Sequence, residues 1–348
     1  MQVKTNSLKA WVLASRPKTL AGAVAPVLVG IAYGAFTTAT EGAAGKTGIV
    51  IVPSVLCILF AVLMQIDANF INDYFDWKKG ADKDGRLGPE RACTQGWITP
   101  GAMKKGIATV TAVSFLIGLP LIYYGGWSMA VVGIFCILGA FLYTTRLSYL
   151  GFGDIMVVLF FGIIPVFFTY HVIIWRGLDF PYMLSLEGGG NSGAAALGYI
   201  VFGWIPLLSG LAVGLVTDNL LIVNNYRDRT QDAENGKKTL VVRCGAKAAE
   251  WVYLLNGVFA TVLCMLSCGA FRIFIYYGCL QENIFPFHLV VPLLFLPFLF
   301  ATHRKMIKIN HGKELNAVLG KTSRNILIYS LIFVVTITLT ALPVWYNG

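Results

Sequence analysis

The chain has 348 residues, of which 57% are hydrophobic and only 13% are charged. Soluble domains carry charge on roughly a quarter of their residues. This composition therefore excludes an ordinary soluble protein and predicts an all-α polytopic membrane protein. The formal net charge of +10 raises the question of nucleic acid binding, which the placement of the basic residues answers below.

A membrane-spanning helix needs about 20 apolar residues. Nine apolar runs approach or exceed this length: 19–37, 49–71, 106–124, 127–145, 151–175, 198–223, 249–268, 286–302 and 325–345. Pro26 interrupts the first run and no convincing cleavage site follows it, so we expect a retained span rather than a signal peptide. We predict one transmembrane domain over residues 1–348, in which residues 1–18 form an interfacial segment.

Lysine and arginine are distributed unequally between the loops that would face the two sides of the membrane. All 27 of them except Lys46, Arg176 and Arg272 fall in segments on one side. Cytoplasmic loops of membrane proteins are enriched in these residues. We therefore predict a cytoplasmic N-terminus, with loops 72–105 and 224–248 on the same side. Membrane orientation accounts for the positive charge, so we expect no nucleic acid partner.

A first polar cluster follows the second apolar run, in the stretch QIDANFINDYFDWKKGADKDGRLGPER at 65–91. Asn72 and Asp76 are four residues apart, so they share one face if the helix continues beyond the membrane. Asp82 follows where a glycine allows the chain to turn back. A solvated loop on the positive side would explain the lysines and arginines, but it does not explain the ordered acids.

A second cluster repeats the arrangement at the end of the sixth apolar run. Asn224, Asp228 and Asp232 recur at four-residue intervals, and either Asn224 or its neighbour Asn225 could face inward. Magnesium prefers oxygen ligands and is typically held by one or two carboxylates together with substrate phosphates. We interpret the two clusters as halves of one metal–diphosphate site.

Several basic and phenolic side chains lie near the clusters in the sequence. Arginine and lysine form charge-assisted hydrogen bonds with phosphate oxygens. The candidates for such contacts are Lys78, Arg86, Arg91, Tyr143, Arg146 and Lys237. Arg146 could equally anchor a helix end by snorkelling, and we expect Asp154 to be a capping or paired residue. The scattered cysteines and histidines show no metal-ligand spacing.

A metal–diphosphate site at the ends of membrane helices favours a lipid-soluble substrate with a charged head. A metal ion neutralises charge on a departing diphosphate, and an allylic isoprenoid chain can leave as a stabilised cation. Its tail would lie among the spans, where aromatic faces stabilise the cation by about 0.5–2 kcal/mol each. The acceptor should then be an electron-rich ring.

The chain resembles the UbiA superfamily of membrane prenyltransferases, in particular the branch that acts on 1,4-dihydroxy-2-naphthoate. The resemblance rests on RPKTLAGAVAPVLVG (16–30), NDYFDWKKGADKDGRLGPERACTQGWITPGAMKKG (72–106), GDIMVVLFFG (153–162) and NNYRDRTQDAENGKKTLVVRCG (224–245). It implies about nine transmembrane helices around a central cavity capped by cytoplasmic loops. The commoner spacing in the family places the third acid where this chain has Gly80, and Asp82 instead is typical of the naphthoate and related quinone branch.

The resemblance also implies residue roles. The first aspartate-rich motif corresponds to Asn72, Asp76 and Asp82, with Asp73 included among the catalytic candidates, and the second corresponds to Asp228 and Asp232 with Asn224 or Asn225. These residues would hold Mg²⁺ and diphosphate. The implied reaction joins an all-trans polyprenyl diphosphate to 1,4-dihydroxy-2-naphthoate and releases diphosphate and carbon dioxide, which gives demethylmenaquinol at the bacterial inner membrane.

Two alternatives stay open. A sister enzyme would use the same metal site with another acceptor, such as 4-hydroxybenzoate or a quinone. A transporter would use acids near the middle of the membrane, but we expect the apolar runs to lack charge at that depth. A purely structural role leaves the paired acid clusters unexplained.

Overall fold

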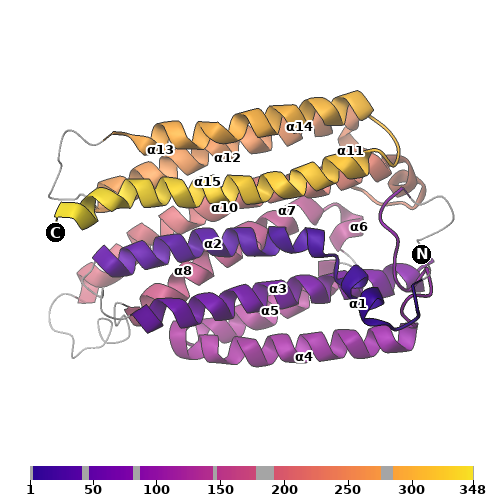
Figure 1. The fold of residues 1–348 in the computed structure, drawn as a ribbon, viewed down its shortest axis with the longest axis horizontal. Helices are drawn as coiled ribbons and strands as arrows, with labels where there is room; N and C mark the ends of the chain where they lie inside the picture. The colour runs from indigo at the N-terminus through magenta and orange to yellow at the C-terminus, as the bar shows by residue number, and fades with distance from the viewer. Residues whose placement is uncertain are drawn as a thin grey trace.

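The computed structural model describes residues 3–40, 47–80, 87–143, 147–177, 192–275 and 285–347. Within these ranges the chain forms helices and no strands. Figure 1 shows long helices running side by side along the longest axis of the molecule. Eight of them are long and apolar enough to cross a membrane. The predicted all-α polytopic fold is confirmed.

The helices follow one another in chain order. Their bounds are α1 Leu8–Ser15, α2 Pro17–Thr40, α3 Thr47–Lys78, α4 Pro100–Gly125, α5 Ser128–Leu142, α6 Ser148–Leu150, α7 Gly153–Val158, α8 Ile164–Gly177, α10 Ser192–Glu234, α11 Leu240–Cys244, α12 Ala246–Ile275, α13 Phe287–Val290, α14 Leu296–Ile309 and α15 Leu315–Asn347. A π-helical turn, η2 (Leu159–Ile163), joins α7 to α8, and a 3₁₀ turn, η4 (Val291–Phe295), joins α13 to α14.

The predicted span 127–145 corresponds to α5, which is shorter than each of the eight candidate spans. It has 15 residues, equivalent to about 22 Å of helix. It falls below the length of the eight long spans and is counted separately as a shorter apolar helix. The number of full-length spans among the described residues is therefore eight rather than nine.

Local sequence signals set several helix starts on the side of the polar loops. Ser7 caps α1 by accepting a hydrogen bond from the backbone N–H of Ala10. Arg16, with a φ of +50°, separates α1 from α2, and Pro17 begins α2 because its missing N–H would lack a partner there anyway. Thr99 caps α4 in the same way as Ser7. Ser7 and Arg16 thus bound a short helix within residues 1–18 and set its turn into the first span.

Glycines bring the central helices unusually close. A Cβ at Gly162, in η2, would lie 2.3 Å from the backbone oxygen of Gly210, and one at Gly30 would lie 2.6 Å from the backbone oxygen of Val166. Small residues at such contacts replace the hydrophobic driving force that is missing between helices in lipid. They bind α10 to η2 and α2 to α8, around the cavities described below.

Two acids lie inside the apolar runs, although not at mid-span. Asp67 and Asp218 lie within the spans of α3 and α10. Each is buried with a polar partner: the Thr111 hydroxyl donates to Asp67 at 2.7 Å, and the Asn256 amide donates to Asp218 at 3.1 Å. Both acids lie within two or three helical turns of the acid clusters, and therefore near the polar end of their helices. A transport site would lie near the middle of the membrane.

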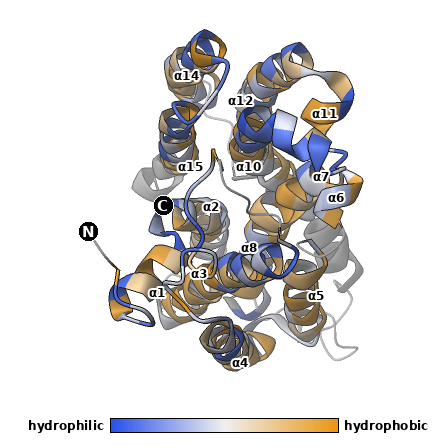
Figure 2. Ribbon diagram, turned by 90° about the vertical axis from the view of Figure 1, so that its right-hand side faces the viewer, coloured by the Kyte–Doolittle hydropathy of each residue, from blue (hydrophilic) through white to orange (hydrophobic). Residues whose placement is uncertain are grey.

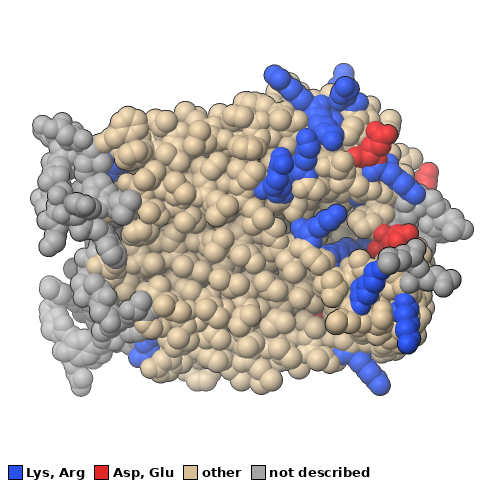
Figure 3. All heavy atoms as spheres, viewed as in Figure 1, with Lys and Arg blue, Asp and Glu red and all other residues tan. Residues whose placement is uncertain are grey.

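The two ends of the helix bundle differ in charge. On the face shown in Figure 3, lysines and arginines gather at the end that also holds the N-terminal helix. Figure 2 looks onto this end, where α1, α6, α7 and α11 lie around the ends of the long helices. We call it the basic end. The described members of the two acid clusters lie here.

Candidate active site

A polar cavity of about 630 Å³ lies at the basic end. Its walls come from the start of α2, the ends of α3 and α10, the α6–α7 segment and the start of α15. Its lining includes the predicted residues Asn72, Asp76, Arg91, Tyr143, Asn224, Asn225, Asp228, Asp232 and Lys237. Residues far apart in the sequence thus meet at one site, which supports the interpretation of the two clusters as halves of one site.

The first cluster is held by the last turns of α3, which continues past the apolar run to Lys78. This continuation places Asn72 and Asp76 on one face, as the four-residue spacing predicted. Arg91, from the loop that follows, donates to the Asp76 carboxylate and forms an ion pair with it. The Arg91 side chain is only 9% exposed, so the pair fixes the loop against the cavity wall.

Asp73 has a different position from its neighbours in the motif. It is buried, and its two carboxylate oxygens accept hydrogen bonds from the backbone N–H groups of Ala92 and Cys93, at 2.8 Å each. Asp73 is absent from the described lining of the polar cavity. Its geometry is that of a residue that anchors the 91–98 loop, so the structure does not support its prediction as a catalytic residue.

The second cluster lies on the last turns of α10, which runs unbroken to Glu234. Arg227 holds Asp228 with two hydrogen bonds, from Nε at 2.7 Å and from a terminal nitrogen at 2.6 Å. Lys237 forms an ion pair with Asp232 at 3.2 Å. Asn224 and Asn225 both line the cavity, so the choice between them stays open.

Tyr149, in the short helix α6, also lines the polar cavity. The ammonium groups of Lys79 and Lys237 lie 4.2 and 5.4 Å from its ring centroid, which is within cation–π range. Burial raises the pKa of Tyr149, although Lys237 opposes the rise. Its hydroxyl therefore remains protonated at neutral pH and can donate a hydrogen bond into the cavity. No periodic pattern marks this residue in the sequence, since it lies between the predicted spans.

The remaining predicted residues do not join this group. Lys78 is exposed at the end of α3 and is not among the described residues that line the cavity. Asp82, Arg86 and Arg146 lie outside the described residues. Asp154, predicted as a cap or paired residue, instead lines the cavity.

Sequence reasoning missed Arg227 and Asn316. The Arg227 side chain is 2% exposed, and besides holding Asp228 it donates to the Asn316 side chain of α15 at 2.7 Å. The Asn316 amide in turn donates to the backbone oxygen of Leu87 at 2.9 Å. This chain of contacts links the second acid cluster to the loop that follows the first. In the sequence, the only indication of this role was that Arg227 directly precedes Asp228.

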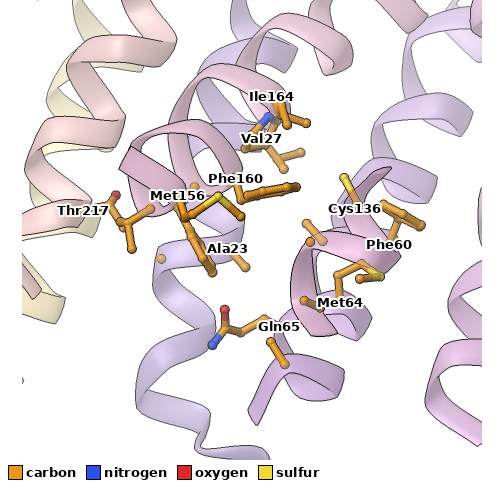
Figure 4. Close-up of a pocket in the computed structure, with 18 of the residues that line it drawn as sticks. Ala23, Val27, Phe60, Met64, Gln65, Cys136, Met156, Phe160, Ile164 and Thr217 are labelled. Atoms are coloured by element: carbon orange, nitrogen blue, oxygen red, sulfur yellow. The ribbon is translucent and has the colours of Figure 1, made fainter. Parts of the chain in front are cut away.

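An apolar cavity of about 290 Å³ continues from the polar one toward the middle of the bundle (Figure 4). Thr19, Asn72, Tyr143, Leu220, Leu221 and Asn224 line both cavities. Aromatic and aliphatic side chains form its walls, and the phenylalanines among them are Phe60, Phe160, Phe161 and Phe168. The structure thus identifies which of the many aromatics line a pocket, a choice that the sequence left open.

The acid clusters fit a metal ion that is shared with a phosphate ligand. In the part of the chain that the structure describes, no three or more His, Cys, Asp or Glu side chains lie close enough together to hold a metal. Asp76, Asp228 and Asp232 are instead separate acids, each beside a cation. Because Mg²⁺ usually takes one or two carboxylates and completes its shell with phosphate oxygens and water, this donor set suits a metal bound together with diphosphate.

Comparisons with known proteins agree with this geometry. The model described as the UbiA prenyltransferase family matches residues 23–323. The 1,4-dihydroxy-2-naphthoate octaprenyltransferase of Haemophilus influenzae is 33% identical over 271 residues, which cover 75% of this chain and 77% of that protein. The protein of the same name from Escherichia coli (strain K12) is 30% identical over 345 residues, which cover 95% of this chain and 96% of that protein.

Solved structures share the fold. An apo UbiA homologue from Aeropyrum pernix K1 superposes with a TM-score of 0.59 at 15% identity, covering 92% of this chain and 98% of that one. A UbiA homologue from Archaeoglobus fulgidus, bound to DMAPP and Mg²⁺, gives a TM-score of 0.54 at 14% identity and covers 94% of this chain and 99% of its own. Motifs, fold and relatives lead to one conclusion: the chain belongs to the UbiA prenyltransferase family.

Proposed function

We propose that this membrane prenyltransferase attaches an all-trans polyprenyl chain, from its diphosphate, to 1,4-dihydroxy-2-naphthoate, with loss of carbon dioxide and formation of demethylmenaquinol. The names of the relatives from Haemophilus influenzae and Escherichia coli favour this acceptor. The observation that carries the proposal is the continuity of the two cavities: acids from α3 and α10 line a polar chamber that shares lining residues with an aromatic one.

Magnesium is the metal that we propose, because its oxygen preference matches the site and because related structures hold Mg²⁺ with prenyl diphosphates. Asp76, Asp228 and Asp232, with Asn72 and an amide of the 224–225 pair, would hold it. Asp82 remains a predicted further ligand. When bound, the ion supplies neutralising charge for the departing diphosphate.

The cations that pair with the acids would also bind diphosphate oxygens. Arg91 and Lys237 each face the cavity while held by a carboxylate, so their positions are set before the substrate arrives. Arg16 and Lys18 add positive charge from the start of α2. Preset donors cost little reorganisation when charge develops on the leaving group.

The apolar cavity would receive the first isoprene units and protect the reacting carbon. Phe160, Phe161 and Phe168 exclude water from its walls, and an allylic cation formed there would otherwise be captured by water. Their ring faces would stabilise that cation by about 0.5–2 kcal/mol each. Attack by the electron-rich ring on the allylic carbon forms the new C–C bond, and loss of the carboxylate as carbon dioxide then restores the aromatic ring.

We infer that the basic end faces the cytoplasm, at the inner membrane of a bacterium. The positive-inside distribution supports this orientation, and the basic residues that Figure 3 shows at one end give it a structural basis. The water-soluble head groups of both substrates would then reach the site from the cytoplasm, and the polyprenyl tail would reach it from the lipid.

The choice of acceptor is tested by supplying purified protein with a polyprenyl diphosphate and one aromatic acid at a time. We expect prenylated, decarboxylated product from 1,4-dihydroxy-2-naphthoate and none from 4-hydroxybenzoate. Turnover of 4-hydroxybenzoate alone would overturn the proposed acceptor and leave the family assignment intact.

A further inference from the structure

Gln65 lies on the face of α3 that leads to the acid cluster, yet none of the roles above uses it. Residues 65, 69, 72 and 76 are spaced by four, three and four positions, so they form one stripe on the helix. Gln65 therefore lies about 10 Å deeper along the helix axis than Asn72. It lines the apolar cavity (Figure 4).

A network of hydrogen bonds fixes which way the Gln65 amide points. The Asn69 amide nitrogen donates to the backbone oxygen of Ser15 at 2.9 Å, and a carbonyl can only accept. This leaves the Asn69 side-chain oxygen facing Gln65, whose amide nitrogen donates to it at 3.4 Å. The same nitrogen donates to the Thr19 hydroxyl oxygen at 3.2 Å. The Thr19 hydroxyl itself donates to the backbone oxygen of Arg16 at 2.9 Å.

The opposite end of the Gln65 amide is thereby left for a ligand. Its side-chain oxygen is buried and has no hydrogen-bond partner among the described residues. The residue as a whole is also buried, with 9% of its surface exposed. A buried amide oxygen without a hydrogen-bond partner is energetically unfavourable. Such an atom in the wall of a substrate cavity is a candidate recognition group.

The chemistry of the reactants decides which of them this oxygen would bind. An amide oxygen only accepts hydrogen bonds. A polyprenyl chain has no donor, and an ionised diphosphate offers acceptors only. The aromatic acceptor alone among the reactants carries hydroxyl donors.

We propose that the Gln65 side-chain oxygen accepts a hydrogen bond from a ring hydroxyl of the aromatic acceptor. The inference rests on the proposed function and names a residue for the half of the reaction that the acid clusters do not explain. The contact holds the ring between the two cavities, and it leaves electron density on the hydroxyl oxygen that activates the ring for attack. Thr19 and Asn69 are positioning residues, because they act through Gln65.

The test uses Gln65→Met, which keeps an unbranched side chain of similar length and removes the amide. Gln95→Met is the matched control, because Gln95 is exposed in the 91–98 loop. Both purified proteins are given the dihydroxy acceptor and analogues in which one hydroxyl is methylated. Melting temperatures in detergent show whether each variant is folded.

We expect Gln65→Met to lose about 10-fold or more in kcat/KM for the dihydroxy acceptor, since one hydrogen bond of about 1.4 kcal/mol corresponds to a factor of ten. The loss should shrink to about 2-fold with the analogue whose recognised hydroxyl is methylated, and KM for the polyprenyl diphosphate should stay within about 2-fold. Thr19→Val, which removes the hydroxyl that orients the amide, should show a smaller loss with the same acceptor dependence.

Equal losses with the dihydroxy acceptor and every methylated analogue would mean a structural role and would overturn the inference. Full activity of Gln65→Met would overturn it too. No product from wild-type protein and the dihydroxy acceptor would overturn the proposed function itself, and this result is distinguishable because it does not depend on the variant.

Discussion

Replacement of Asp73 by Asn tests whether this acid anchors the 91–98 loop or belongs to the metal site. In the structure, Asp73 accepts two backbone hydrogen bonds, from Ala92 and Cys93. An asparagine side chain has one acceptor oxygen, so one of these backbone N–H groups would lose its partner. Hydrogen bonds to a charged group contribute about 1.5–3 kcal/mol each. We therefore expect the loop to open about ten- to a hundred-fold more often.

Cys93 reports this opening directly. Burial raises the pKa of its thiol to about 12, and the Asp73 carboxylate adds to the rise. Because only the thiolate is nucleophilic, Cys93 reacts chiefly in the open loop, where its pKa falls back toward the ordinary value. Asp73→Asn should thus speed the alkylation of Cys93 by N-ethylmaleimide, measured by peptide mass spectrometry. Prenylation should fall because Arg91 loses its fixed position against Asp76.

Glu90→Gln is the matched control, because it removes an exposed acid directly before the 91–98 loop and should leave the alkylation of Cys93 slow. If Cys93 stays equally slow in Asp73→Asn, the anchoring argument fails. If Asp73→Asn needs more magnesium for activity but its Cys93 is not alkylated faster, Asp73 belongs to the metal site instead.

Three further predictions concern the site, the packing and the orientation. Asp76→Ala or Asp228→Ala should each lower kcat by at least about a hundred-fold, because both acids line the cavity, and each should also lower the melting temperature, because it leaves the buried Arg91 or Arg227 without its carboxylate; wild-type turnover in a prenylation assay would refute the metal-site assignment. Gly162→Ala should destabilise the protein by several kcal/mol, because its methyl would lie 2.3 Å from a backbone oxygen of α10, whereas Gly101→Ala, with nothing within 4 Å, should be neutral in a thermal unfolding assay. Cys244, which is exposed at the basic end, should react with a membrane-impermeant maleimide in inside-out vesicles and not in intact spheroplasts; the opposite pattern would reverse the proposed orientation.

The sequence could predict the membrane fold and the partners across the cavity, because both follow from regular spacing. Apolar runs of sufficient length reveal spans directly, and Asn72 and Asp76 share a face as soon as α3 continues beyond the membrane. The acids of α10 meet them because both helices end at the same side. Spacing along the chain was enough for these features.

Other features depend on packing that no local pattern encodes. Asp73 differs from Asp76 by three positions, yet it points to the 91–98 loop, whose backbone amides are available only in the folded protein. Asn316 joins the site from a helix more than two hundred residues away from Leu87. The orientation of the Gln65 side-chain oxygen likewise depends on the folded protein, because it is set by the hydrogen bonds that the amide nitrogen donates to Thr19 and Asn69.

The most direct test of the central claim is a mass-spectrometric assay of the purified protein in nanodiscs, with 1,4-dihydroxy-2-naphthoate, a polyprenyl diphosphate, and magnesium either present or removed by chelation. The account predicts a prenylated, decarboxylated naphthoquinol that forms only with magnesium. Consumption of the diphosphate with the naphthoate untouched would contradict the proposed acceptor, and product formation at the full rate without any divalent metal would contradict the metal–diphosphate site.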